Sequence, residues 1–405
     1  MKSHYKPCCQ KCDGNVLRRT ELSRGPAYDA SNIPEPDNLR SAFIMKPTLI
    51  VAALSMIAPL TVSAQTSSSA QVYGLMDAGV VVEQGCNGDC ARPKIDSGVA
   101  SGSRLGVRGR EELGGGTAAV YTVEAGVLND TGAAEQHDKL FNRQAYVGIN
   151  GPLGLVTMGR QYNMVYDRLT SVADPFHGGM AGSASNLVGY TTKRYDNSIK
   201  YKTPRARSGL IGSLLYSYGE SPFSTKVNRA YGGTVDYESG PVNISITHQR
   251  KDNMLDATGT TPKVDQSARN SLIAANINFG RFIGYAAFGQ SRGEGSSHWD
   301  MSNPYGAVAQ ALPTDKSRDV LFGISVPMGA TTWLASYIRK DDRTLLNRDA
   351  NQIAVGASYA ISRRTDFYAS LAKIQNRNGA GYTVGNATNL GRGDRAVNIG
   401  MRHAF

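Results

Sequence analysis

The sequence predicts an all-β fold: a 16-stranded antiparallel transmembrane β-barrel with short turns at one end and long loops at the other. Three observations predict it. From residue 72 onward, segments of about 8 to 12 residues alternate between apolar and small or polar side chains, as strands with two unlike faces do. Tight turns alternate with long polar loops along the chain. The final segment also alternates, and the chain ends on Phe405.

Composition excludes several other classes of protein. The 405 residues include 45 glycines and 20 tyrosines, and 19% of them are charged, which argues against a disordered chain and against a coiled coil. The one candidate for a membrane helix, 49–60, is too short to span a bilayer, so a polytopic helical membrane protein is excluded. A membrane β-barrel is not excluded, because its alternating strands average to a hydrophilic composition.

Residues 45–64 have the features of a secretory signal peptide. Lys46 supplies a short basic region, 49–60 supplies the apolar region, and small residues precede a cleavage point before Gln65. The alternative, a buried core helix, is disfavoured by Pro59 and by the polar run that follows.

A signal peptide should begin a chain, so we expect translation to start at Met45 and residues 1–44 to be an over-extended N-terminus outside the fold. Three cysteines in this stretch lack an obvious fourth ligand for a metal site. The barrel then comprises residues 65–405. Its net charge falls from +11 to +8, because residues 1–64 hold eight basic and five acidic side chains.

The remaining cysteines, Cys86 and Cys90, predict a small disulfide loop. An exported protein folds in an oxidising compartment, where two cysteines in C-N-G-D-C are first interpreted as a bridge. Two soft ligands make a metal site the weaker interpretation, and we expect no catalytic role for the loop.

The expected strands number sixteen, an even count that closes an antiparallel barrel and leaves no unpaired edge in the bilayer. They lie near 71–82, 102–110, 117–127, 139–149, 155–162, 193–203, 210–219, 230–238, 242–251, 268–279, 282–290, 318–327, 331–341, 350–360, 365–375 and 395–405. A barrel of this size leaves an aqueous channel.

The clearest alternation lies in 351–359. Ile353, Val355 and Tyr359 share one face with an alanine, and the other face is small and polar, as expected if it meets water. In the last segment, alternate residues up to Phe405 also share one face. This pattern resembles the signal by which outer-membrane barrels are recognised for insertion.

The connectors have two sizes. Short ones lie at 151–154, 280–281, 328–330 and 362–364, and long ones near 83–100, 128–138, 163–191, 252–267, 291–316 and 376–393. In an outer-membrane barrel the short turns face the periplasm and the long loops face outward.

Several motifs resemble those of the Gram-negative general porins of beta-proteobacteria. They are S-R-L-G-V-R-G-R-E-E-L-G-G-G at 103–116, L-F-N-R-Q-A-Y-V-G-I at 140–149, G-R-Q-Y at 159–162, R-Y-D-N-S-I-K-Y at 194–201, Y-G-L-M-D-A-G at 73–79 and the ending G-M-R-H-A-F. The resemblance covers the whole of 65–405. It implies a trimeric passive channel in which the third loop folds inward to narrow the lumen, opposite an arginine cluster on the wall.

The arginines can be compared with the strand pattern. Arg104 and Arg108 lie opposite Leu105 and Val107, and Arg194 shares a face with other polar residues of 194–201 while Tyr195, Ile199 and Tyr201 form the other face. An arginine facing lipid at mid-bilayer would cost about 2–4 kcal/mol, so these three belong in the lumen. Periodicity does not decide the orientation of Arg143 or Arg160, whose inward placement is implied by the resemblance alone.

The connector 163–191 is the candidate inward loop. It carries Asp167 and Asp174, and its run D-P-F-H-G-G suits a tight reversal. We expect these two carboxylates to form the acidic side of the constriction, with Glu124 as a counter-ion on the wall. The family often has an acidic residue beside the Phe of this loop, where this chain has His177 or Asp174-Pro175, so the acidic side is expected to be thin.

We therefore expect an outer-membrane general diffusion porin, a homotrimer surrounded by outer-membrane lipid and lipopolysaccharide, that passes small hydrophilic solutes and prefers anions. A substrate-specific channel for an organic anion or oligosaccharide is the alternative. An enzyme on a barrel is disfavoured because the sequence has no convincing Ser–His pair. We expect no cofactor, no metal and no nucleic-acid partner.

Overall fold

The computed structural model describes residues 68–86, 92–219, 225–255, 264–297, 314–389 and 391–405. The described residues belong to one compact unit, Val62–Phe405. The expected extension 1–44 and signal peptide 45–64 lie outside them, so the start at Met45 and the cleavage site stay predictions.

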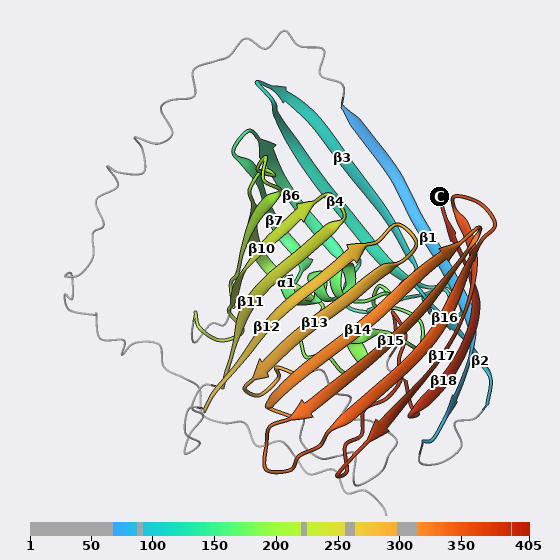
Figure 1. Ribbon diagram of the computed structural model, residues 1–405. Helices are drawn as coiled ribbons and strands as arrows, with labels where there is room; N and C mark the ends of the chain where they lie inside the picture. The colour runs from blue at the N-terminus through green and yellow to red at the C-terminus, as the bar shows by residue number, and fades with distance from the viewer. Residues whose placement is uncertain (1–67, 87–91, 220–224, 256–263, 298–313, 390) are drawn as a thin grey trace, which may run out of the picture. The chain divides into compact units, whose positions relative to one another are not determined.

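The described part of the chain contains sixteen strands that form a closed antiparallel barrel (Figure 1). They are β1 (Ser69–Gln84), β3 (Arg104–Gly114), β4 (Thr117–Leu128), β6 (Gln144–Gly151), β7 (Gly154–Tyr162), β8 (Arg194–Lys202), β9 (Leu210–Ser217), β10 (Ala230–Ser239), β11 (Val242–Leu255), β12 (Val264–Asn278), β13 (Ile283–Arg292), β14 (Lys316–Met328), β15 (Thr331–Asp342), β16 (Ala350–Ala360), β17 (Thr365–Asn376) and β18 (Arg395–Ala404). Pairing of β1 with β18, from Leu75↔Ala404 to Gln84↔Arg395, closes the cylinder and removes its edges.

Two further short strands, β2 (Lys94–Ser97) and β5 (Ala133–Ala134), lie in loops and pair with β1 and β4. Among the helices of the described residues, none has the length and apolar character needed to cross a bilayer.

All sixteen predicted strands are confirmed, with ends that mostly move by a few residues. The largest shift is at 139–149, where β6 begins only at Gln144. The reason is Asn142, whose side-chain oxygen accepts a hydrogen bond from the Gly126 N–H at 2.8 Å. A side chain thus takes the place of a backbone partner, and the strand cannot start earlier.

The predicted turns are also confirmed. Consecutive strands are joined at one end by short connections, and Gly154, Gly280 and Gly329 in these turns have φ values of 119°, 85° and 63°. Such values favour glycine, which explains why this residue recurs there. The long loops lie at the other end of the barrel, called the loop end below.

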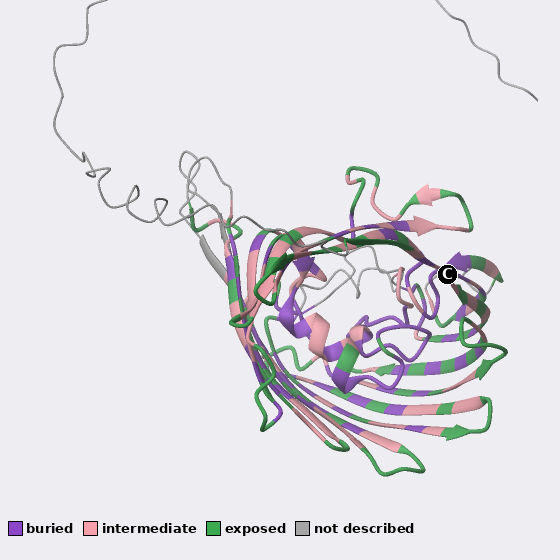
Figure 2. Ribbon diagram, turned by 90° about the horizontal axis from the view of Figure 1, so that it is seen from above, coloured by how far each residue is buried: buried purple, intermediate pink, exposed green. Residues whose placement is uncertain are grey.

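The outer face of the barrel is apolar, and only part of the inner face is exposed to water. Ile353, Val355 and Tyr359 on β16 are 62%, 50% and 53% exposed, as expected for lipid-facing side chains. Gln352 and Ala354 point inward but are buried. Figure 2 shows the reason: α1 (Met164–Arg168) and buried loop segments lie within the ring of strands, so this part of the inner face meets protein and not water.

One predicted face is wrong. Tyr195 was expected to share the outer face with Ile199, yet it is buried against Met164 of α1, and its hydroxyl accepts a hydrogen bond from the Gln249 side chain at 3.3 Å. The register of β8 against β7 shifts between Gly159 and Gln161, and Asn197 has a φ of 51°. This β-bulge inserts a residue and reverses the alternation before it.

Candidate pore constriction

The connection from β7 to β8, residues 163–193, folds into the barrel and is called the inward loop below. It contains α1, a π-helical turn (Leu169–Ala173) and a 3-10 turn (Ala184–Asn186). Asn163 starts α1, because its side-chain oxygen accepts a hydrogen bond from the Tyr166 N–H at 2.6 Å. Because α1 and neighbouring loop segments lie inside the ring of strands (Figure 2), the fold agrees with the prediction that this loop enters the lumen.

The inward loop packs against one side of the barrel only. Its apolar residues, among them Leu169, Phe176 and Leu187, form one core with the inner faces of β12 to β18, including Leu321 and Ile338. Polar contacts anchor it along the same wall: the Gly189 N–H donates to Asp319 at 2.9 Å, the Asn186 amide to Gln352 at 2.8 Å and the Ala181 N–H to Ser370 at 3.2 Å. The open lumen is therefore left on the side of β3 to β8.

Asp174 does not face the lumen, which corrects the prediction that it forms the acidic side of the constriction. Its side chain is fully buried inside the inward loop. The carboxylate accepts hydrogen bonds from the N–H groups of Phe176, Gly178 and Ala184 at 2.9, 2.9 and 2.8 Å. Burial raises the pKa of Asp174, against the effect of these donors. The residue fixes the reversal at D-P-F-H-G-G and contributes no charge to the pore surface.

Arg104, Arg143 and Arg194 come together with Asp167 around one cavity of about 210 Å³. The first lies at the start of β3, the second just before β6 and the third at the start of β8. Because these positions follow loops at the same end of three strands in one wall, their side chains converge. Asp167 reaches the cavity from α1 on the facing inward loop.

The orientation of the Arg143 side chain cannot be predicted from strand periodicity. Val147 on β6 is 60% exposed on the outer face, and strict alternation would put Arg143 there too. Arg143 precedes the strand, however, and lies in an irregular segment where its backbone N–H donates a hydrogen bond to the Glu124 backbone carbonyl at 3.1 Å. The side chain is consequently turned inward and is 7% exposed.

Two carboxylates lie behind the arginines. Glu124 accepts a hydrogen bond from Arg143 at 2.8 Å and from the Tyr73 hydroxyl at 2.9 Å, in agreement with its expected role as a counter-ion. Glu135, which the sequence did not single out, lies 3.2 Å from Arg143 and 3.8 Å from Arg194. Although burial opposes it, these two guanidinium groups lower the pKa of Glu135. Arg143 is thus shared between two acids.

Arg194 and Arg104 are less neutralised. The Arg194 guanidinium stacks 4.8 Å from the Tyr162 ring centre and donates to the Tyr162 hydroxyl at 3.2 Å, and its buried Nε has no hydrogen-bond partner in the part of the chain that the structure describes. Arg104 donates to the Gly102 carbonyl at 2.9 Å and forms no ion pair within 4.0 Å among the described residues. Both side chains therefore retain positive charge directed at the cavity.

Sequence reasoning missed Lys193, a cation that does not line the cavity but is the neighbour of Arg194, which does. It precedes Arg194, donates from Nζ to the Ala387 carbonyl at 3.0 Å and lies 5.9 Å from the Tyr166 ring centre. Burial lowers the pKa of Lys193 to about 8, and Arg194 and Arg143 act in the same direction while Glu135 opposes them. The K-R pair at 193–194 was the only sequence signal for it.

The acidic side of the cavity is thin, as the sequence indicated. Asp167 lies 3.2 Å from Arg168 and 4.0 Å from Lys200, so it is itself partly neutralised. His177 also lines the cavity, with a φ of 51° and its ring Nδ1 3.3 Å from the Thr170 carbonyl.

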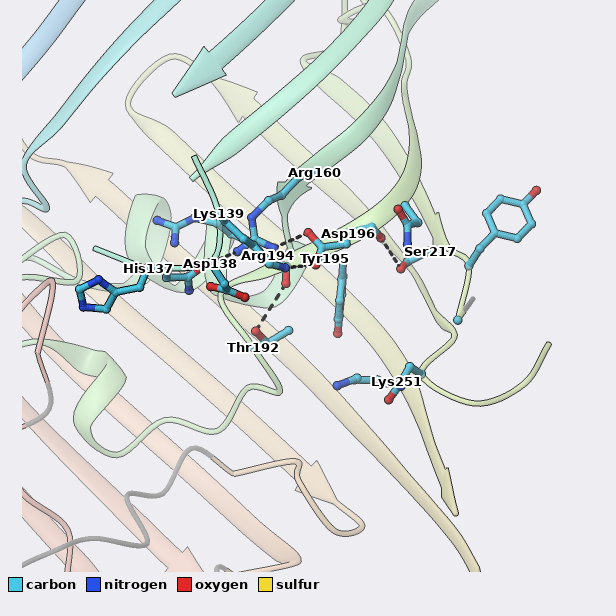
Figure 3. Close-up of a pocket in the computed structure, with 15 residues that line it drawn as sticks. His137, Asp138, Lys139, Arg160, Thr192, Arg194, Tyr195, Asp196, Ser217 and Lys251 are labelled. Atoms are coloured by element: carbon cyan, nitrogen blue, oxygen red, sulfur yellow. Dashed lines mark hydrogen bonds and ion pairs between the residues drawn. The ribbon is translucent and has the colours of Figure 1, made fainter. Parts of the chain in front are cut away.

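Arg160 and Arg108 lie outside this cavity. Arg160 lines a larger cavity of about 900 Å³ nearer the loop end, where it pairs with Asp196, which Lys139 also contacts at 2.6 Å (Figure 3). Arg108 lies further along β3, where it donates to Gln71 at 3.0 and 2.7 Å and stacks 5.1 Å from the Tyr73 ring centre. The five predicted arginines thus occupy three places, of which the two cavities share Arg194 in their lining.

The remaining predicted residues lie at the barrel ends. Phe405 pairs its backbone with Gly74 of β1 at 3.1 and 3.0 Å, at the seam that closes the barrel. Cys86 is disulfide-bonded. Cys90 lies outside the described residues, so a Cys86–Cys90 bridge stays a prediction.

Comparison with known proteins agrees with this architecture. Residues 49–379 match the family described as Gram-negative porin. An outer membrane porin protein of Bordetella pertussis is 28% identical, with 89% of this chain and all of that protein covered. Outer membrane porin protein 32 of Delftia acidovorans is 27% identical with the same coverage.

Solved structures show the same fold. The anion-selective porin from Comamonas acidovorans superposes with a TM-score of 0.68 at 25% identity, covering 84% of this chain and all of that one. OmpT of Vibrio cholerae in its trimer form gives a TM-score of 0.57 at 14% identity, covering 84% of this chain and 99% of that one. The chain belongs to the Gram-negative porin family, and it is an outer-membrane β-barrel diffusion channel.

Proposed function

We propose that this porin is an anion-preferring general diffusion pore whose narrowest part is the 210 Å³ cavity between the basic wall and the inward loop. The observation that carries the proposal is the lining of that cavity: Arg104, Arg143 and Arg194 face the single carboxylate of Asp167. A ring of fixed charge selects among ions by electrostatics, and no energy source is needed for small hydrophilic solutes to move down their gradient.

The charges contribute unequally to this preference. Glu124 and Glu135 offset Arg143 at 2.8 and 3.2 Å. The net positive field therefore comes mainly from Arg104 and Arg194, with Lys193 behind them. The structural relative from Comamonas acidovorans is itself an anion-selective porin, which supports the same direction of selectivity.

The test is the reversal potential of refolded protein in planar bilayers of zwitterionic lipid across a KCl gradient. We expect chloride preference in the wild type and a loss of it in the double variant Arg104→Gln/Arg194→Gln. The matched control Arg108→Gln/Arg160→Gln removes two arginines that lie outside the cavity and should keep most of the preference. Cation preference in the wild type, or equal effects of the two double variants, would reject the proposal.

The alternative is a channel specific for an organic anion or oligosaccharide. Tyr162 and Tyr166 stack at 5.9 Å and both line the cavity, which is the start of a surface on which a sugar ring can lie. The Tyr162 hydroxyl, however, is occupied by two arginines, and Tyr190 beside Tyr166 is buried. Saturable block of the chloride current by an added oligosaccharide or dicarboxylate would favour the alternative.

We also propose that the chain forms a homotrimer. OmpT of Vibrio cholerae has been solved in a trimer form and shares the fold. The proposal predicts a band of about three times the monomer mass on unheated SDS gels, converting to monomer on boiling. Light scattering that gives only monomers in mild detergent would contradict it.

A further inference from the structure

The larger cavity near the loop end has a lining of its own chemical character. Its volume is about 900 Å³, against about 210 Å³ for the constriction cavity. The loop before β6 and the loop-end parts of β7, β8, β9 and β11 form its walls (Figure 3). Arg194 lines both cavities. In an outer-membrane barrel the loop end faces the exterior, so a solute that enters from outside meets the larger cavity first.

Lys251 is a cation of this cavity whose charge is not matched by the protein. It lies on β11, and its neighbours across the sheet are Ala230 of β10 and Ala268 of β12, both 0% exposed. These two small side chains leave the lysine space to extend, and Figure 3 shows its amino group pointing into the cavity. Among the residues that the structure describes, Lys251 forms no hydrogen bond and has no carboxylate within 4.0 Å. Its charge is therefore free to bind a solute.

The other charges of the larger cavity are matched differently. Asp196 pairs with both Arg160 and Lys139, the latter at 2.6 Å. Asp138 is exposed in the same lining and has no basic partner within 4.0 Å in the described part of the chain. The lining as a whole holds four Lys or Arg and two Asp side chains, so it carries a positive excess although carboxylate oxygens are present. The cavity therefore attracts anions but contains groups that repel a high negative charge.

Neutral polar groups complete the lining. Asn197 and Asn228 are exposed there, and their side-chain amides form no hydrogen bond with any residue that the structure describes. An amide both donates and accepts hydrogen bonds, and the carboxylate of Asp138 accepts them. Hydroxyl groups of a solute can bond to all three side chains, whereas an aliphatic acid without hydroxyl groups leaves them unused.

We propose that the larger cavity binds sugar acids, single-ring solutes with several hydroxyl groups and one carboxylate, and passes them by way of Arg194 to the constriction. The carboxylate pairs with Lys251, and the hydroxyl groups bind Asp138 and the two asparagine amides. A multiply charged anion is disfavoured because Asp138 and Asp196 share the lining. The smaller constriction cavity beyond limits the solute to one ring. Because capture of this kind serves a pore through which anions diffuse, it rests on the proposed function.

The experiment measures binding by saturation-transfer NMR titrations of the full porin refolded in a neutral detergent, so that no ion flow is needed. Three probes share a six-membered ring: D-galacturonate, D-galactose, which lacks the carboxylate, and cyclohexanecarboxylate, which lacks the hydroxyl groups. We expect wild type to bind D-galacturonate about 10-fold more tightly than either of the others, since a hydrogen bond to a charged group contributes at least this factor.

The test variant is Lys251→Gln, and the matched control is Lys202→Gln, which removes a lysine that lines another cavity on the short-turn side of the constriction. Lys251→Gln should weaken D-galacturonate binding about 10-fold and leave D-galactose binding unchanged, because only the carboxylate loses its partner. Lys202→Gln should change neither, and Lys251→Arg should retain most of the affinity. Heat-modifiable migration on gels verifies first that each variant is folded.

Four results would overturn the proposal. They are equal binding of D-galactose and D-galacturonate by wild type, equal binding of cyclohexanecarboxylate and D-galacturonate, equal losses in Lys251→Gln and Lys202→Gln, and a loss of D-galactose binding in Lys251→Gln as large as that of D-galacturonate. The chloride reversal potential of the same preparation separates this test from that of the proposed function. Chloride preference without sugar-acid binding rejects the binding site alone, whereas sugar-acid binding with cation preference supports the site and rejects the anion-preferring pore.

Discussion

Glu135 should limit the anion preference of this pore, and removing its charge should strengthen that preference. The carboxylate lies 3.2 Å from Arg143 and 3.8 Å from Arg194, two residues that line the proposed constriction. For an ion about 6 Å away in water, one unit charge contributes about 0.7 kcal/mol, or about threefold in local concentration. Glu135→Gln raises the anion concentration and lowers the cation concentration by this factor, so the chloride-to-potassium permeability ratio should rise by up to about tenfold.

The assay is the reversal potential in a KCl gradient at two salt levels. About 6 Å is shorter than the Debye length at 0.1 M and longer than the roughly 3 Å at 1 M, so the gain should be present at low salt and largely lost at high salt. Asp138→Asn is the control, because Asp138 lies in the same loop but lines the larger cavity instead. Equal shifts in both variants, or a gain that persists at about 1 M, would refute the electrostatic reasoning.

Three further predictions follow from the same geometry. Raising the pH from 7 to 9 should weaken the chloride preference, because Lys193 with a pKa of about 8 is mostly charged at pH 7 and mostly neutral at pH 9. In the Lys193→Gln variant the reversal potential should not change with pH over this range. Asp174→Ala leaves three buried N–H groups without an acceptor and should lower the free energy of unfolding by about 3 kcal/mol. The loss should appear as a lower temperature of heat-modification and as noisier single-channel currents. Currents as quiet as those of wild type would contradict the role of Asp174 in holding the loop. Arg108→Gln should leave selectivity nearly unchanged in the same bilayer assay, since the side chain is held by Gln71 outside the cavity.

The strands could be predicted from sequence because one rule acts on every residue of the barrel wall. A side chain such as Ile353 faces lipid and its neighbour Gln352 does not, so the alternation is written directly in the sequence. The rule failed where the backbone left regular geometry. The bulge at Asn197 reversed the face of Tyr195, and the side-chain cap by Asn142 delayed β6, and neither event changes the local apolar pattern.

The candidate site could be predicted only in part, for a different reason. Arg104 and Arg194 stand at the starts of strands with recognisable motifs, whereas Glu135 lies in a loop whose path depends on tertiary contacts. Asp174 shows the converse: an acidic residue in the right loop was assigned to the pore, yet its carboxylate closes a turn inside that loop. Sequence indicates which charges are available but not which of them are already satisfied by backbone N–H groups.

The same distinction explains why net charge is a poor guide to selectivity in this barrel. Lys340 on β15 and Asp319 on β14 face inward like the pore arginines, but they pair at 2.8 Å and are 0% and 1% exposed. The inward loop covers them and even donates the Gly189 N–H to Asp319 at 2.9 Å. A charge that is buried and paired contributes to holding the loop, not to the field in the water-filled path. Under the proposed function, selectivity is therefore set by the side of the barrel that the loop leaves open, where Arg104 and Arg194 remain, and moving the loop would change it without altering a single charge.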